Sequence, residues 1–241
     1  MRFVLVHGAF SGGWVWGPLA EQLEARGHAV EAPDLPGGGQ DRTPIHEITL
    51  DAYAARICEV VGASPEPVVL AGHSMGGMAI TQAAPRCADR IASMVYVAAF
   101  LPQEGQSLIA LTQLPEGRDD QVQANLIVTG DPPVATMTAE ASRAAVYAHC
   151  SDERAAWALA SRTPQPVFPF TEPVKLDGFD FAGIQRAYVL CGQDRAIPPP
   201  LQRLMLTAAG CSPVIELDTD HVPQLSRTAE LAEALHSLAA A

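Results

Sequence analysis

Residues 68–79, Val-Val-Leu-Ala-Gly-His-Ser-Met-Gly-Gly-Met-Ala, contain the stretch that decides the fold. The apolar run from Val68 to Ala71 predicts a buried strand, and the small residues after Ser74 predict a helix. Between them, Gly72 to Gly76 fits the pattern G-x-S-x-G, in which the serine occupies a tight strand-to-helix turn with a strained backbone. The two glycines are needed because a Cβ at either position would clash with neighbouring backbone. We therefore interpret Ser74 as a nucleophile.

Strand and helix patterns alternate before and after this stretch. Short apolar runs predict strands at residues 3–6, 28–32, 67–71, 91–98, 186–190 and 214–217. Apolar residues at helical spacing predict helices at residues 14–26, 50–61, 75–84, 199–209 and 228–238. Strands joined by helices favour a parallel sheet with right-handed crossovers. The predicted fold class is α/β, with a mostly parallel central sheet that is flanked by helices.

The alternation is lost between residues 103 and 183. Prolines are frequent in this segment, and helical spacing returns only at residues 138–147 and 151–159. We interpret residues 103–183 as a helical cap insertion. The core domain is then formed by residues 1–102 and 184–241.

The composition limits the classes of partner. Of the 241 residues, 48% are hydrophobic and 17% are charged, and the formal net charge is −12. This hydrophobic content rules out disorder, and the length is sufficient for a full core. The acidic excess disfavours binding to nucleic acid and to anionic membranes. No apolar run approaches the roughly 20 residues that a membrane span needs.

The start of the chain and its cysteines give an expectation about the cellular location. The apolar stretch within residues 1–8 is too short for a signal peptide, and a glycine turn follows at once. Five cysteines, at wide spacings and without a C-x-x-C motif, favour reduced thiols. We therefore expect a cytoplasmic protein. Because no zinc-type or EF-hand spacing occurs, we expect no metal site.

A serine nucleophile needs a base within hydrogen-bond reach, and the base needs a carboxylate that orients it. Among seven histidines, His221 follows the last predicted strand in a short loop before the final helix. Asp194 follows a strand and a glycine turn between the serine and the histidine, where the acid is expected. Glu104, after the fourth strand, is the alternative acid. Asp218 and Asp220 are near His221 in sequence, but the side chains of such close neighbours usually point apart.

Attack by a serine on a substrate also needs an oxyanion hole, which consists of two backbone N–H donors aimed at the developing negative charge. The N–H of Met75, the residue after the nucleophile, is one predicted donor. The second is expected in the loop after the first strand, where we assign Ala9 and keep Phe10 as the alternative.

At these residues the chain resembles the α/β-hydrolase superfamily. Within it, the chain is similar to a branch that holds plant methyl esterases, hydroxynitrile lyases and related bacterial esterases. The strand-to-helix turn at residues 72–77, which is called the nucleophile elbow, is specific to the superfamily. Gly13-Trp14-Val15-Trp16 and Phe100-Leu101-Pro102 point to the branch. The matching pieces are spread over nearly the whole chain. The resemblance implies a Ser-His-Asp triad, a small helical cap and no cofactor.

Two positions bear on the reaction. Hydroxynitrile lyases of this branch carry a threonine after the first-strand histidine and a lysine after the catalytic histidine, and that lysine supplies positive charge for cyanide. The equivalent positions here are Gly8 and Val222. The missing cation disfavours cyanohydrin cleavage, and Gly8 leaves space beside the nucleophile for an acyl carbon. We therefore predict a carboxylic ester hydrolase that acts through an acyl-enzyme.

The expected partner is a small, neutral and largely apolar ester. Phe10, Phe100 and Trp157 are the candidate substrate-binding residues, although aromatic residues at such spacings are more often core. A hydroxynitrile-lyase-type C–C lyase, a cofactor-free oxygenase and a non-catalytic ligand-binding sensor on the same fold are the alternatives. A homodimer is common in this fold, but the sequence does not decide the oligomeric state.

Overall fold

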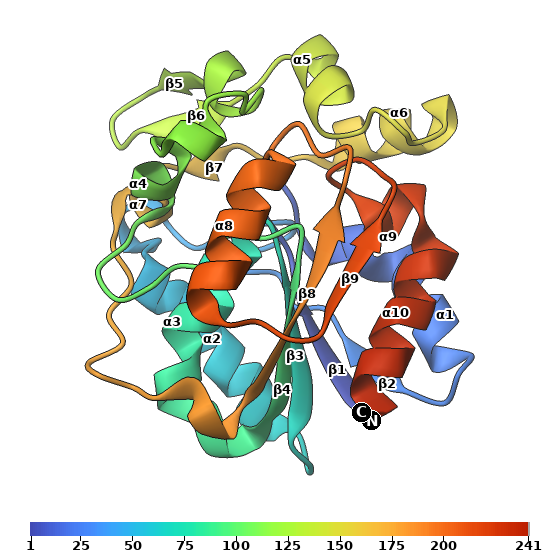
Figure 1. The fold of residues 1–241 in the computed structure, drawn as a ribbon. Coiled ribbons are helices and arrows are strands. Elements are labelled where there is room, and N and C mark those ends of the chain that lie inside the picture. The colour runs from blue at the N-terminus through green and yellow to red at the C-terminus, as the bar shows by residue number, and fades with distance from the viewer. Residues whose placement is uncertain (241) are drawn as a thin grey trace.

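The computed structural model describes residues 1–240 and has three layers, with one sheet between two groups of helices (Figure 1). Six parallel strands form this sheet in the order β2-β1-β3-β4-β8-β9. The strands are β1 (Arg2–Val6), β2 (Ala29–Glu31), β3 (Val68–His73), β4 (Ile91–Val97), β8 (Gln185–Cys191) and β9 (Val214–Leu217). The predicted α/β fold with a parallel, helix-flanked sheet is confirmed.

The helices bury opposite faces of the sheet. On one face lie α1 (Gly17–Glu24), α9 (Pro223–Ser226) and α10 (Thr228–Ala240), and on the other α2 (Leu50–Ala63), α3 (Gly76–Cys87) and α8 (Pro199–Ala209) (Figure 1). Side chains alternate along a strand, so β1 contributes to both cores. Phe3 and Leu5 pack with the first group, and Val4 and Val6 with the second. None of the described helices is long and apolar enough to cross a membrane.

The segment between β4 and β8 lies over the carboxyl ends of the strands (Figure 1). It contains α4 (Leu108–Thr112), α5 (Ala139–Ala145), α6 (Asp152–Ser161) and α7 (Phe168–Thr171). It also contains an antiparallel sheet of β5 (Ile127–Thr129), β6 (Val134–Thr136) and β7 (Gln165–Pro166), which the sequence pattern did not predict. Strands of two or three residues are too short to leave a period of alternation in the sequence.

Short 3₁₀ turns complete the described secondary structure. They comprise Gly13–Trp16, Ile45–Glu47, Ala88–Arg90, Pro115–Gly117, Gln123–Asn125 and Phe181–Gly183. The first of them replaces the beginning of the helix that was predicted at residues 14–26. The α-helix starts only at Gly17, with Pro18 in its first turn, where the missing N–H of proline costs no hydrogen bond.

Glycines allow β3, α3 and the end of β4 to approach one another closely. A Cβ on Gly72 would lie 2.7 Å from the carbonyl oxygen of Gly76, and a Cβ on Gly77 would overlap the carbonyl oxygen of Phe100. Because these neighbours are backbone atoms, they cannot move aside without shifting whole elements. The turn between β3 and α3 therefore depends on the absence of these side chains.

We expect Gly77→Ala to lower the free energy of unfolding by about 2 kcal/mol, because the new methyl group meets the backbone of Phe100. Gly62→Ala is the matched control, since Gly62 is also helical and no atom of residues 1–240 outside its own helix and chain neighbours lies within 4 Å of the added Cβ. The control should be neutral or slightly stabilising, because alanine favours a helix more than glycine does. Urea unfolding of both variants measures the difference, and equal stability of the two would contradict this packing.

Candidate active site

Ser74 lies at the turn between β3 and α3 with a φ of 55°, in the left-handed region that non-glycine residues rarely adopt. Hydrogen bonds hold this turn on both sides. The Ser74 carbonyl accepts from the N–H groups of Gly77 at 3.0 Å and Phe100 at 3.1 Å, and the Ser74 N–H donates to Val97 at 3.4 Å. The strained geometry that the G-x-S-x-G pattern predicted is present, and it projects the Ser74 side chain into a cavity.

The loop after β1 closes on this turn. A Cβ on Gly8 would lie 2.8 Å from the Cβ of Ser74, and one on Gly76 would lie 2.7 Å from the carbonyl oxygen of Val6. The two predicted donors, the N–H groups of Ala9 and Met75, therefore belong to segments that touch beside Ser74. Neither N–H donates to an acceptor among the described residues. Both are available to a substrate oxygen.

His221 is held by a buried carboxylate. Its Nδ1 donates to Asp194 Oδ2 at 2.8 Å, and the two side chains are 5% and 0% exposed. This tautomer leaves the lone pair of His221 Nε2 free, and His221 lines the same cavity as Ser74. The Ser74 hydroxyl makes no hydrogen bond to a described residue. Catalytic hydrogen bonds often form only in the complex with substrate.

Asp194 has its remaining acceptor capacity filled by other donors. Its Oδ1 accepts from the N–H groups of Ala196 at 2.7 Å and Ile197 at 2.9 Å, and its Oδ2 also accepts from Gln202 Nε2 at 3.0 Å. Four donors stabilise the ionised carboxylate and fix its orientation toward His221. These contacts explain how the carboxylate can be fully buried.

The other acids considered from the sequence have other partners. Glu104 is exposed and accepts from the N–H of Leu176 at 2.9 Å. Asp218 accepts from Gln193 Nε2 at 3.0 Å, and Asp220 accepts from the N–H of His149 at 2.7 Å. Asp194 is thus the carboxylate that the fold brings to the imidazole.

Burial lowers the pKa of His221, but three carboxylates outweigh it. Asp194 acts by its charge and its hydrogen bond, and Asp220 and Asp120 act by their charges, so the pKa of His221 is raised above its usual 6.5. A base with a raised pKa holds its proton more strongly once it has accepted one. It is neutral, and able to accept a proton, only above that pKa.

The cavity between the core and the segment above it is mostly apolar. Its apolar side chains are Ala9, Phe10, Val15, Met75, Phe100, Leu108, Val122, Met137, Val146, Phe170, Ala196, Ile197 and Val222. Three ionisable side chains besides His221 and His73 also line it, namely Asp120, Tyr147 and Arg162. No cluster of potential metal ligands occurs among the described residues. The surroundings suit an organic ligand with few polar groups.

Comparison with known proteins agrees with this geometry. The model of the alpha/beta hydrolase family matches residues 3–234. The chain belongs to this family. It is 33% identical over 253 residues to salicylic acid-binding protein 2 of Nicotiana tabacum, which covers 99% of this chain and 96% of the relative. The hydrolase is also 32% identical over 251 residues to an alpha-hydroxynitrile lyase of Arabidopsis thaliana, with coverage of 99% and 96%.

A solved relative has nearly the same fold as this alpha/beta hydrolase. The crystal structure of polyneuridine aldehyde esterase, a protein of Rauvolfia serpentina, superimposes with a TM-score of 0.87 at 27% identity. The match covers 99% of this chain and 98% of the other. The family thus includes esterases and a lyase on one scaffold, and the scaffold alone does not distinguish them.

Two of the three predicted substrate contacts lie in the cavity of the hydrolase. Phe10 and Phe100 line it, and the Phe10 ring packs edge-on against Phe170 at 6.5 Å between centroids. The structure places Trp157 elsewhere. Trp157 is 42% exposed, and its ring packs against that of Trp14 at 5.0 Å between centroids, because α6 turns this side chain toward the surface near α1. Helical spacing alone could not show that direction.

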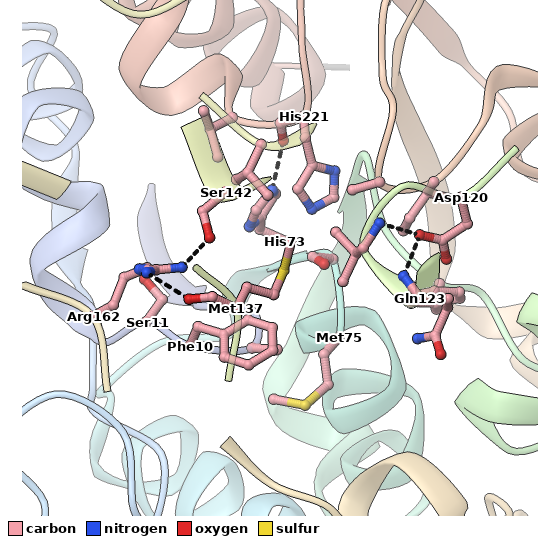
Figure 2. A pocket seen from close by; sticks show the side chains of 18 of the residues that line it. Phe10, Ser11, His73, Met75, Asp120, Gln123, Met137, Ser142, Arg162 and His221 are labelled. Atoms are coloured by element: carbon pink, nitrogen blue, oxygen red, sulfur yellow. Dashed lines mark hydrogen bonds between the residues drawn. The ribbon is translucent and has the colours of Figure 1, made fainter. Parts of the chain in front are cut away.

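The sequence did not reveal a role for His73. This buried histidine donates from Nε2 to the backbone carbonyl of His221 at 2.7 Å, and the two rings lie 4.6 Å apart (Figure 2). Burial and the neighbouring His221 lower the pKa of His73 well below its usual value, so it stays neutral. Its hydrogen bond supports the loop that carries His221.

Asp120 is a second residue of the hydrolase that sequence reasoning missed. It is 4% exposed, lines the cavity, and accepts from the N–H groups of Val122 at 2.7 Å and Gln123 at 2.9 Å through Oδ1 (Figure 2). Burial raises its pKa to about 6 against the effect of these two donors. An acidic residue in an irregular loop carries no sequence signal for this position.

We expect Asp120→Asn to move the acid limb of the kcat/KM profile to lower pH by about half a pH unit. Asp120 is ionised above about pH 6, where its charge raises the pKa of His221. Without that charge, His221 stays neutral, and therefore able to accept a proton, at lower pH. The Asn side chain can still accept both backbone N–H bonds.

Asp119→Asn is the matched control, because the Asp119 side chain is 80% exposed. Initial rates of ester hydrolysis between pH 5 and pH 9 give both profiles. An unchanged acid limb in Asp120→Asn, or an equal displacement in the two variants, would show that Asp120 does not act on His221.

Proposed function

We propose that this alpha/beta hydrolase is a serine esterase that cleaves the carboxylic ester of a small, largely apolar substrate through an acyl-enzyme. The observation that carries the proposal is the buried hydrogen bond between His221 Nδ1 and Asp194, with the imidazole lining the same cavity as Ser74. Ser74, His221 and Asp194 would then act as nucleophile, base and orienting acid.

In the first half of the reaction, His221 Nε2 takes the proton of the Ser74 hydroxyl while Oγ bonds to the ester carbonyl carbon. The carbonyl electron pair moves onto the oxygen, and the N–H groups of Ala9 and Met75 donate to it. When the carbonyl re-forms, the bond to the alcohol oxygen breaks. His221 donates its proton to that oxygen, and the alcohol leaves.

In the second half, water repeats the attack on the acyl-enzyme. His221 takes one proton from the water, the hydroxide oxygen bonds to the acyl carbon, and the bond to Ser74 Oγ breaks. The proton returns to Oγ, and the carboxylic acid is released. Asp194 stabilises the imidazolium in both halves and keeps its own negative charge throughout.

A lyase is the second candidate, and the relative named alpha-hydroxynitrile lyase favours it. Residues beside the nucleophile support the esterase instead. Val222, next to His221, is apolar and 2% exposed, so it offers no charge to a cyanide leaving group. A side chain in place of Gly8 would press on Ser74 Cβ, whereas glycine leaves room for an acyl carbon.

We expect Ser74→Ala to lower kcat/KM for p-nitrophenyl butyrate by about 10⁴-fold or more, because the nucleophile is lost. The variant should unfold at the same urea concentration as the wild type, since the Ser74 side chain projects into the cavity and the hydrogen bonds that hold the turn are made by the Ser74 backbone. Release of p-nitrophenol measures turnover. Labelling with an alkyl phosphonate, followed by mass spectrometry of the tryptic peptides, locates the nucleophile.

Substrate assays separate the alternatives. Labelling of Ser74 without turnover of any ester would indicate a ligand-binding sensor. Release of cyanide from mandelonitrile in the absence of esterase activity would indicate the lyase. Near-normal ester hydrolysis by the Ser74→Ala variant would show that the proposed mechanism is wrong.

A further inference from the structure

A guanidinium group forms part of the cavity wall opposite Asp120. Arg162 follows the last residue of α6, and its Nη1 and Nη2 donate to the Ser142 hydroxyl and, at 3.2 Å, to the Met137 carbonyl (Figure 2). Both partners are neutral. Among the described residues, Arg162 takes part in none of the ion pairs that involve a carboxylate. Its positive charge is therefore not compensated by a direct partner.

Two polar atoms on this wall are buried and have no hydrogen-bond partner in the described part of the chain. One is Arg162 Nε, and the other is the hydroxyl of Ser11, which is only 9% exposed. Both residues line the cavity, and the N–H of Thr163 donates to the Phe10 carbonyl at 3.2 Å, which joins their two segments. Unpaired buried donors destabilise a protein, and most are satisfied by a partner or ligand. Arg162 Nε and the Ser11 hydroxyl can thus both donate a hydrogen bond to an acceptor atom of a bound ligand.

The charges that line the cavity indicate which part of a ligand would lie at Arg162. Asp120 lies at the far side of the cavity from Arg162, with His221 between them in the view of Figure 2. The carboxylates of Asp120 and Asp194, the second of which is hydrogen-bonded to His221, concentrate negative charge at the triad end. An anionic group is repelled from that end and attracted to Arg162. Guanidinium groups bind carboxylates strongly because their planar N–H donors match the two oxygens.

We propose that the substrate is a half-ester, which carries a free carboxylate in addition to the ester group. The carboxylate accepts hydrogen bonds from Arg162 and Ser11, and the ester carbonyl lies at Ser74. This inference rests on the esterase function proposed above and narrows its substrate class. It also replaces the expectation of a neutral ester, because the net charge of the whole chain does not describe the local field at Arg162.

The test compares matched esters by pH-stat titration. Monomethyl adipate against methyl hexanoate places the carboxylate on the acyl part, and carboxymethyl butyrate against ethyl butyrate places it on the alcohol part. We expect wild type to prefer the charged member of one pair. Arg162→Gln should reduce the ratio of kcat/KM, charged over neutral, by about 30-fold, and Ser11→Ala by about fivefold, mainly through KM.

Arg143→Gln is the matched control. Arg143 also donates to backbone carbonyls, those of Tyr147 and Cys150, but it pairs with Asp152 and does not line the cavity. It should leave the charged-over-neutral ratio unchanged. If Arg162 serves only to hold the segments together, Arg162→Gln will lower kcat/KM for the charged and the neutral ester by the same factor, as a general loss of structure would.

The outcomes separate the two proposals. If wild type hydrolyses none of the four esters and no other ester, the esterase function fails. The half-ester proposal fails, and the esterase function stands, if wild type hydrolyses the neutral esters and prefers them in both pairs. The same conclusion follows if Ser11→Ala and Arg162→Lys both leave the ratio of kcat/KM, charged over neutral, at its wild-type value. Arg162→Lys keeps the charge but loses the planar donors, so it tests the recognition if Arg162→Gln does not fold.

Discussion

The close approach of three backbone segments around Ser74 is the constraint on which the site depends. Gly76 lets α3 touch the end of β1, Gly77 lets it touch the end of β4, and Gly8 lets the first loop lie against Ser74. Hydrogen bonds from Gly77 and Phe100 then hold the Ser74 carbonyl. Backbone strain at a positive φ is tolerated because the surrounding contacts leave the turn no alternative. Donors from two segments consequently meet beside one hydroxyl.

This mostly apolar cavity has negative charge at one end and positive charge on the facing wall. Asp194 is buried, accepts hydrogen bonds from four donors and orients His221. Asp120 adds a second negative charge at the same end and helps to raise the pKa of His221. Arg162 provides positive charge on the facing wall. An apolar lining strengthens each of these interactions, because water screens them less.

The features predicted from the sequence are those written in local patterns. Strand and helix periodicity identified the parallel sheet, and the glycine spacing identified the turn at Ser74. Chain order pointed to Asp194 and His221, which the fold brings into one hydrogen-bonded pair. The remainder depends on contacts between distant segments that no pattern records. Asp120 and Arg162 line the cavity from irregular stretches, whereas Trp157 lies outside the cavity because of how α6 is oriented.

A crystal structure of the protein after reaction with an alkyl phosphonate, which imitates the tetrahedral intermediate, would show directly whether the three segments meet around Ser74 as described. We expect a bond from phosphorus to Ser74 Oγ, with the phosphoryl oxygen between the N–H groups of Ala9 and Met75 and His221 Nε2 close to Oγ. A phosphoryl oxygen that contacts neither N–H, or an imidazole that is separated from Asp194 in the adduct, would contradict this expectation.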